Sequence, residues 1–348
     1  MKLSQSITFK CPSCGAYLEY DPSRRQLTCP YCGASFDERQ LAEQSQAREA
    51  AAEQKPSGAA VKGYHCQSCG AEVVVSDTTA ATRCYYCHSP VVLNDRLDDA
   101  FRPDGVVAFR LDKQAAEKEF RRFIGRYRFV DRSFFSPEQL EDFSGVYYPY
   151  WVGDVSGEAR FEGEGTRTSV MSSPRETVTT TRFFRVKREG RLSFAQMVRK
   201  GLTAVDRRLS DGVHPYRLEE MKPFASGYLT GFMAEKRDVE QADAQGDMER
   251  EAEQSAQRIM KQGGGYDRLT GQTEFKADRV QMRYVLLPAW VLTYQARNGE
   301  KPYYYMMNGQ TGHVCGRLPI DKKKLLLGCA ALGLAVFGAL CVGGAWLW

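Results

Sequence analysis

Hydrophobic and polar residues in the middle of the chain, residues 96–320, alternate with two different periods. VVAFRL at 106–111 has period two, which predicts a strand packed on a buried sheet. Asp112 follows as a helix N-cap, and the next apolar residues recur at the spacing of one helix face. We therefore expect a helix whose buried face carries Ala116, Phe120, Phe123, Ile124 and Tyr127.

Further strands and one long helix are predicted downstream. Strand-like patterns cover 145–164, with glycine-rich turns, and then 176–188, 191–199, 280–297 and 301–307. A polar helix is expected at 238–262, acidic at its start, basic at its end and terminated by Gly263–Gly265. Asn308-Gly309 provides a hairpin turn before a strand at 313–317. This mixture predicts an α+β domain over residues 96–320.

Two of the predicted strands begin alike, at 147–161 and at 285–305, because both carry the pattern Pro-x-Trp-Val. Pro149 and Trp151 in the first correspond to Pro288 and Trp290 in the second. A strand-like stretch and a helix precede each of them, which suggests two strand–helix–strand units and an internal duplication. Two unrelated strands led by proline are the alternative, which stays open at this point. If the units are related, we expect the tryptophans to occupy equivalent core positions.

Residues 1–95 contain two cysteine-rich segments joined by a polar stretch. We expect zinc ribbons at 1–36 and 63–95. Residues 37–62 are rich in Ala, Glu and Gln and include Pro56-Ser57-Gly58, which predicts a solvated helical spacer and a flexible link. The chain is therefore expected to be multi-domain, with the α+β domain at 96–320 and a basic stop and membrane tail at 321–348.

Eight of the eleven cysteines fall in four C-x-x-C pairs with one repeated spacing. Fourteen residues separate the two pairs of each set, and two such pairs joined by a short hairpin form a tetrahedral four-thiolate zinc site. Four thiolates close the coordination shell, so we expect two structural zinc ions, with disulfides or another metal as alternatives. The predicted ligands are Cys11, Cys14, Cys29 and Cys32 in the first set and Cys66, Cys69, Cys84 and Cys87 in the second. Gly15, Gly33 and Gly70 each follow a second cysteine, where we expect positive φ angles.

The last 24 residues, Leu325–Trp348, contain no charged side chain. As a helix they would extend about 36 Å, enough to cross a hydrocarbon core of about 30 Å. Lys322, Lys323 and Lys324 precede them, and the positive-inside rule places such residues in the cytoplasm. We expect a single-pass protein of the inner, cytoplasmic membrane with its N-terminal domains in the cytoplasm. Small residues recur every fourth position, which favours contact with a helix of another membrane protein: Ala331, Ala335, Ala339 and Gly343.

Composition and missing motifs narrow the function classes. With 43% hydrophobic and 26% charged residues the chain can bury a sizeable core, and a net charge of +5 is too small to indicate nucleic-acid binding by itself. The N-terminus shows no secretory signal, so the cysteines are expected to remain reduced and to bind metal. The sequence lacks the P-loop, nucleophile-elbow and H-E-x-x-H patterns. We therefore expect a protein that is not an enzyme.

The doubled cysteine ribbons, the TTAAT stretch before Cys84, RPDGVVAFRL, YYPYWV and the block LLPAWVLTY…MNGQTG…LPID together resemble a known family. It is a bacterial TFIIB-type zinc-ribbon family, whose members are often labelled as PriA-like replication restart helicases. The motor motifs of a helicase are absent from the sequence. The resemblance implies a membrane scaffold of a phage-shock-like envelope-stress system. It further implies partners of three kinds: a second membrane protein, an SPFH/flotillin-type protein and a PspA-type protein.

These patterns lead to two functional hypotheses. The first is a non-enzymatic adaptor, anchored in the membrane lipid by its C-terminal helix, whose ribbons dock partner proteins. The second is a membrane-tethered nucleic-acid-binding protein, for which Lys10, Arg24, Arg25, Arg83, Tyr31, Tyr85 and Tyr86 would supply cations and aromatic rings. Binding to nucleic acid should weaken steeply with salt, which distinguishes the two.

Overall fold

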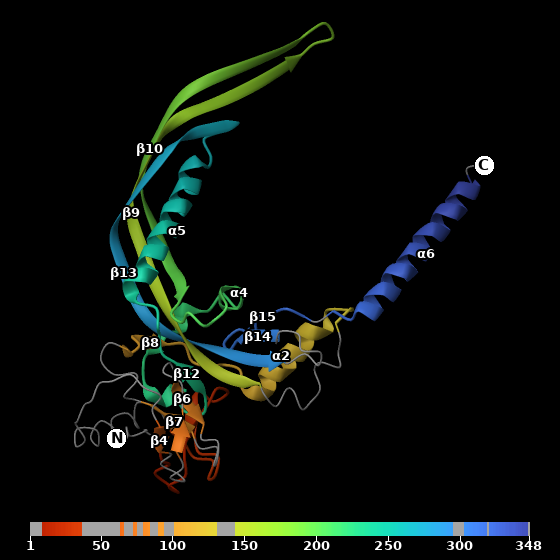
Figure 1. The fold of residues 1–348 in the computed structure, drawn as a ribbon. Helices are drawn as coiled ribbons and strands as arrows, with labels where there is room; N and C mark the ends of the chain where they lie inside the picture. The colour runs from red at the N-terminus through yellow and green to blue at the C-terminus, as the bar shows by residue number, and fades with distance from the viewer. Residues whose placement is uncertain are drawn as a thin grey trace.

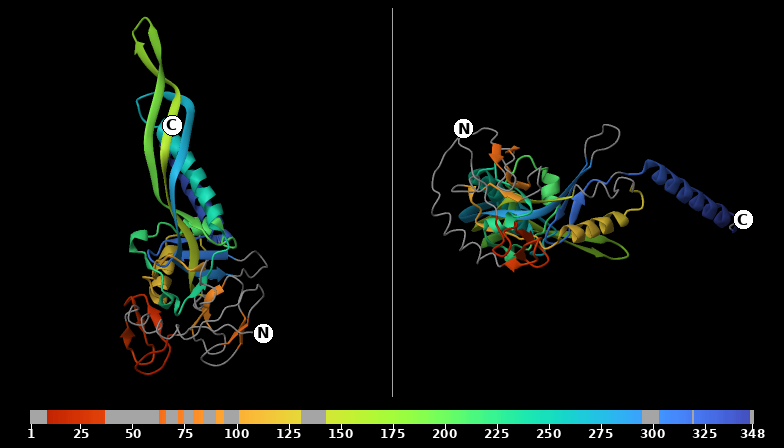
Figure 2. Two further views of the ribbon diagram at one scale, coloured as in Figure 1. Left: turned by 90° about the vertical axis from the view of Figure 1, so that its left-hand side faces the viewer. Right: turned by 90° about the horizontal axis from the view of Figure 1, so that it is seen from below.

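The computed structural model describes residues 9–36, 63–65, 72–74, 79–83, 90–93, 101–130, 143–294, 303–318 and 320–346. Three long strands rise together as a curved arm, and the shorter strands gather at its base (Figure 1). The arm consists of β9 (Ser144–Ser172), β10 (Thr177–Lys200) and β13 (Arg268–Tyr294). The C-terminal helix α6 (Lys322–Trp346) projects away from the base by itself (Figures 1 and 2).

Antiparallel pairing holds the arm together over its length. β9 turns back into β10 between Ser172 and Thr177, while β13 follows the other edge of β9 from Arg268, which lies opposite Thr166. Helix α5 (Gln241–Lys261) lies along the arm (Figure 1). Its buried residues recur every fourth position, so one helix face covers the strands, through Ala244, Met248, Ala252, Ala256 and Met260.

The glycines expected to form turns between 145 and 164 lie inside β9, so that prediction is wrong. Gly163 faces Gly271 of β13 in register. A Cβ atom on Gly163 would lie 2.1 Å from the carbonyl oxygen of Thr270, so a glycine is required for the two strands to approach this closely. The stretches expected at 176–188 and 191–199 likewise form one strand, β10, with a bulge between Phe194 and Met197.

The helix expected after Asp112 is confirmed as α2 (Lys113–Gly125). The Asp112 carboxylate accepts a hydrogen bond of 2.7 Å from the N–H of Ala115, as expected for an N-cap. Three of the predicted face residues are buried and Phe123 is half-buried; the buried ones are Ala116, Phe120 and Ile124. Tyr127 lies beyond the helix and is 46% exposed, so its predicted place on the buried face is wrong.

The predicted end of the long polar helix and the hairpin that follows the last long strand are confirmed. Gly263–Gly265 comes directly after α5 and all three residues have positive φ angles, while Arg258 and Lys261 lie in the last turn. β14 (Tyr303–Asn308) and β15 (Val314–Gly316) form the hairpin. The side chain of Asn308 is fully buried and donates hydrogen bonds to two carbonyl oxygens that follow the short helix α4 (Arg207–Gly212), those of Val213 and Pro215.

The short strands flank the central pair β9–β13 in matching order. β8 (Gly105–Val106) runs parallel to β13, and β12 (Met233–Glu235) runs parallel to β9. β11 (Lys222–Pro223) pairs antiparallel with β8, and β6 (Thr79–Arg83) pairs antiparallel with β12. The strand order of the large sheet is β11-β8-β13-β9-β12-β6-β7, where β7 is Pro90–Val92; β10 also pairs with β9, and β14 also pairs with β13. Counted outward from the central pair, β8 and β11 therefore match β12 and β6 in order and direction, and β7 is an additional strand beyond β6.

The hydrogen bonds of Trp151 in β9 and Trp290 in β13 show the same correspondence between the two strands. Trp290 donates its indole N–H to the carbonyl oxygen of Leu111 at 3.1 Å, just before the N-cap of α2. Trp151 donates to the carbonyl oxygen of Val239 at 3.0 Å, just before the N-cap of α5. Both side chains are buried, so the two tryptophans occupy equivalent core positions.

The backbone contacts of two glycines match in the same way. The N–H of Gly309 donates to the carbonyl oxygen of Pro288 at 2.9 Å, and the N–H of Gly201 donates to that of Pro149 at 2.8 Å. The carbonyl oxygen of Gly309 accepts from the N–H of Leu111, and that of Gly201 accepts from the equivalent N–H of Val239. The part of the domain around β9 and the part around β13 are thus joined by equivalent backbone hydrogen bonds.

We expect Trp151→Phe and Trp290→Phe each to destabilise the central domain, by about 1–2 kcal/mol, because each leaves a carbonyl oxygen without its donor and removes part of a packed ring. For a domain of this size the thermal midpoint should fall by about 2–8 °C. Thermal unfolding of the detergent-solubilised chain measures this. Tyr304→Phe, at a residue 49% exposed, is the control and should leave the midpoint nearly unchanged. A neutral result for either tryptophan would contradict the equivalence.

The large sheet includes strands from residues 63–95, the region in which the sequence predicts the second ribbon. β4 (Gly63–His65) and β5 (Glu72–Val74) pair as a separate two-stranded sheet. β6 and β7 (Pro90–Val92) instead extend the large sheet beyond β12, and Ala80 and Ala81 are buried in its core. The sheet therefore continues across the expected boundary between 63–95 and 96–320.

Candidate metal centre

The first two C-x-x-C pairs form two tight turns, or knuckles, with the same local geometry. The N–H of Gly15 donates to the carbonyl oxygen of Cys11 at 2.9 Å, and the N–H of Gly33 donates to that of Cys29 at 2.9 Å. Gly15 and Gly33 have φ angles of 75° and 73°, which confirms the prediction for these positions. Each glycine therefore lets the chain turn back over the place where a metal would bind.

A small antiparallel sheet brings the two knuckles together. Its strands are β1 (Glu19–Asp21), β2 (Gln26–Thr28) and β3 (Ser35–Phe36), in the order β1-β2-β3. Leu18 and Leu27 are fully buried, and they belong with Cys11 and Cys29 to the same apolar cluster as the core of the central domain. The fourteen residues between Cys14 and Cys29 thus form the expected hairpin that joins the two knuckles.

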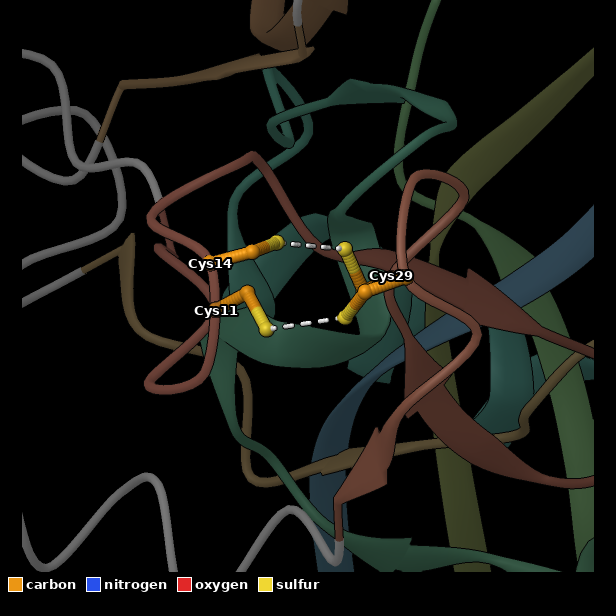
Figure 3. A group of neighbouring side chains, drawn as sticks. Cys11, Cys14 and Cys29 are labelled. Atoms are coloured by element: carbon orange, nitrogen blue, oxygen red, sulfur yellow. Dashed lines mark hydrogen bonds between the residues drawn. The ribbon is translucent and has the colours of Figure 1, made fainter.

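The four sulfur atoms of the first set converge on one point, as Figure 3 shows for Cys11, Cys14 and Cys29. All four sulfurs lie within 4.8 Å of one another. The distance between Cys11 Sγ and Cys32 Sγ is 3.6 Å, and that between Cys14 Sγ and Cys29 Sγ is 3.5 Å. A tetrahedral zinc ion with Zn–S bonds of about 2.3 Å requires sulfurs about 3.8 Å apart. The donor set and its spacing therefore fit zinc.

Without a cation, the electrostatics of the site keep some thiols protonated. Burial raises the pKa of Cys11, but hydrogen bonds from the backbone of Cys14 and Ser13 outweigh it and bring this pKa to about 6. A backbone hydrogen bond from Ala16 lowers the pKa of Cys14, while the Cys29 side chain and burial raise it to about 12. Four thiolates cannot share this space unless a positive charge compensates them, and a bound zinc ion supplies that charge.

The second predicted ligand set, Cys66, Cys69, Cys84 and Cys87, lies outside the described residues, as does Gly70. The second zinc ion therefore stays a prediction. β5 and β6 fall between the two pairs of this set in the sequence.

The first ribbon is packed against the central domain, which the sequence did not indicate. The backbone N–H of Tyr20 donates to the carbonyl oxygen of Thr230 at 3.1 Å, and its ring meets the edge of Tyr228 with centroids 5.3 Å apart. Glu19 forms an ion pair of 3.3 Å with Arg83 of β6, at the end of that strand. The metal site is thus fixed to the base of the arm.

At the other end of the chain, α6 is one helix that is long and apolar enough to cross a membrane, judged by length and composition. None of the stretch Lys323–Cys341 is buried. Leu326 and Leu334 are 73% and 72% exposed, so large apolar side chains face outward around this helix. Asp321 caps it, accepting hydrogen bonds from the N–H groups of Lys323 and Lys324.

Comparison with known proteins agrees with the metal centre. Residues 9–50 match the family described as TFIIB zinc-binding. The chain is also similar over most of its length to an uncharacterized protein, YdjG of Bacillus subtilis (strain 168), with 28% identity over 336 residues that cover 96% of each protein. No solved structure matches the chain. The chain therefore carries an N-terminal TFIIB-type zinc ribbon with one four-cysteine site, a sheet-rich central region and an apolar C-terminal helix.

Proposed function

We propose that this protein is a non-enzymatic adaptor, anchored in the cytoplasmic membrane by α6, whose zinc ribbons dock partner proteins in an envelope-stress response. The observation that carries the proposal is the combination of a closed four-thiolate site near one end of the chain with an unburied apolar helix at the other. A closed site leaves no position for substrate or water, so its metal stabilises a surface rather than performing chemistry. A helix with large apolar side chains on all sides calls for lipid around it.

The surface of the first ribbon supports a docking role. Tyr31, between the cysteines of the second knuckle, is 87% exposed. Aromatic residues of this kind are enriched at protein interfaces, where a rigid ring contributes much contact area. Because Tyr20 and Glu19 fix the ribbon to the central domain, the exposed ring is held in a constant position relative to the arm. A preorganised surface loses less entropy on binding.

Copurification from solubilised membranes tests the ribbon's part in docking. We expect the double variant Cys14→Ser, Cys32→Ser to recover far less partner protein than the unaltered full-length chain, because the loss of zinc unfolds the surface that carries Tyr31. A chain lacking residues 1–36, which removes the first ribbon and leaves β6 and β7 in the large sheet, should show the same loss. Cys329→Ser, which alters a cysteine of α6, is the matched control and should keep normal recovery. Unchanged recovery with the double variant would contradict ribbon docking.

The nucleic-acid hypothesis rests on Arg24, Arg25 and Tyr31, which are all exposed on the first ribbon. Recovery of DNA or RNA that depends on the ribbon and disappears at high salt would favour this second function over the adaptor. The adaptor is preferred because the ion pair of Glu19 with Arg83 engages one of the cations that were expected to contact nucleic acid.

We also propose that the central domain arose by internal duplication, with 105–201 and 233–309 as the two units. The support comes from the matching order of strands and from the repeated hydrogen bonds of Trp151 with Trp290 and of Gly201 with Gly309. Unrelated strands would share the Pro-x-Trp-Val sequence without sharing these partners. The paired tryptophan variants described above test the equivalence.

A further inference from the structure

A small apolar groove lies where the central domain meets the start of α6. Its volume is about 410 Å³, and it is lined mainly by apolar and aromatic side chains from the end of α2 and from the segment before α6. These include Phe123, Tyr127, Phe129, Leu318, Ile320 and Leu325, with Arg128 as the charged member. Tyr127, Phe129 and Ile320 are 46%, 39% and 60% exposed. Such a concentration of exposed apolar surface requires an explanation in a folded protein.

The groove is joined rigidly to the beginning of the apolar helix. The N–H of Asp321 donates to the carbonyl oxygen of Phe129 at 2.8 Å, and Val130 pairs with Ile320 in a β-bridge. A Cβ atom on Gly328 would lie 2.7 Å from the Phe129 ring, so this ring rests directly on the helix at that glycine. Gly328 is the fourth residue of the uncharged run, about 4.5 Å along the helix axis from its start. If α6 crosses a bilayer, Phe129 must lie at the depth of the headgroups or just below them.

The same region concentrates the positive charge of the chain. Residues 121–130 contain four arginines and no acidic residue, and 316–324 contain one arginine and three lysines against one aspartate. These two segments thus carry a net charge of +7, more than the +5 of the whole chain. Arg126, Arg128 and Arg317 are exposed, and within the described part of the chain no ion pair engages any of them. Their charge is available to an anionic surface.

We propose that this groove and its arginines form a docking site for the anionic phospholipids of the leaflet in which α6 begins. In this arrangement Tyr127 and Phe129 lie in the interfacial region, an apolar chain fills the groove, and Arg126 and Arg128 pair with the phosphate. Aromatic rings favour this region of a bilayer, and basic residues next to a membrane helix are attracted to anionic headgroups. The inference rests on the proposed membrane anchoring and adds to it a lipid class and a fixed orientation of the base of the arm.

Photo-crosslinking of the full-length chain in lipid nanodiscs tests this proposal. A benzophenone amino acid is placed at position 129 and, in a second variant, at the more exposed position 127. The nanodiscs contain phosphatidylcholine and phosphatidylglycerol in equal parts. We expect lipid adducts at both positions, with phosphatidylglycerol in excess over phosphatidylcholine. The same probe at Phe183, which is 75% exposed on β10, should give no lipid adduct.

The charge dependence is tested with two matched variants. Arg126→Gln with Arg128→Gln should bring the adduct ratio of the two lipids towards one, since each basic residue near the surface contributes about fivefold to the attraction. Arg182→Gln with Arg185→Gln removes the same charge from β10 and should leave the ratio unchanged. An excess of phosphatidylglycerol that persists in the first pair would overturn the role of these arginines.

The outcomes separate this inference from the proposed function. A chain that enters nanodiscs but yields no lipid adduct at 127 and 129 overturns the lipid site while leaving the anchor in place. Adducts to a second copy of the chain also overturn it, since they would make the groove a protein interface. A chain that does not enter nanodiscs at all contradicts the membrane anchor, and the lipid site with it.

Discussion

Replacing Cys29 with serine is expected to lower the zinc content of the purified chain by one ion. Cys29 is fully buried, and its sulfur lies 3.5 Å from that of Cys14. A serine hydroxyl does not ionise at neutral pH and cannot replace the thiolate as a zinc ligand. Metal binding to sites of this kind contributes about 10–16 kcal/mol, and a unit of this size has too little core to fold without it. Elemental analysis by mass spectrometry measures the loss.

Two further variants give this experiment its controls. Cys66→Ser should also remove one ion, because the second set repeats the spacing of the first, and the combined variant should contain no zinc. Cys315→Ser should keep both ions, since Cys315 lies in β15 and outside both sets. Full zinc content in Cys29→Ser would contradict the first site. Full content in Cys66→Ser would contradict the second site alone.

The first metal site was predictable because everything that forms it is local. Four cysteines within 22 residues, a hairpin between them and two glycines determine the arrangement. The packing of this ribbon on the central domain was not predictable, because Tyr20 meets Tyr228 and Thr230 across more than 200 residues. The local pattern of hydrophobic and polar residues contains no information about a contact between residues so far apart in the chain. Sequence patterns thus gave the site and not its place on the protein.

The arm shows a second limit of pattern analysis. Strand-like patterns predict strands within β9, β10 and β13, but they also predict turns at the glycines of β9 and strands shorter than those observed. In β9 the glycines serve close contact with the neighbouring strand, as Gly163 does against Thr270 and Gly271. The sequence alone does not distinguish a glycine that is needed for a turn from one that is needed where two strands approach closely. Pairing with a distant strand decides between them.

Tyr127 illustrates a third case, in which helical spacing continues beyond the helix. It has the correct period for the buried face of α2, yet α2 ends at Gly125 and the tyrosine faces outward. Its exposure becomes reasonable beside Phe129 and the beginning of α6, where a lipid surface would replace a protein core. An apolar residue that fits a periodic pattern can therefore serve a different apolar environment.

Ending the chain at Asp321 is expected to transfer the protein from the membrane fraction to the soluble fraction. The deletion removes the apolar helix, which contacts the rest of the protein mainly where Leu325 and Gly328 meet the groove, so the domains before it lose little packing. A milder variant, Leu334→Arg, places a charge near the helix centre, which costs about 2.5–3.5 kcal/mol on insertion and should leave only part of the chain membrane-bound. Leu334→Ile is its matched control and should insert normally. Carbonate extraction followed by sedimentation measures the distribution.

The result also tests how much of the attachment depends on the groove. If the truncated chain still associates weakly with vesicles that contain phosphatidylglycerol, and Arg126→Gln with Arg128→Gln abolishes that residual binding, then the basic and aromatic surface around Phe129 contributes to attachment independently of α6. A truncated chain that stays fully resistant to carbonate would instead mean that another segment inserts in the bilayer. The arm is unsuited to the bilayer interior, because its charged side chains and any backbone N–H or C=O group without a hydrogen-bond partner would be costly in hydrocarbon. Truncation therefore distinguishes a helix that holds the protein in the membrane from one that merely exposes apolar surface.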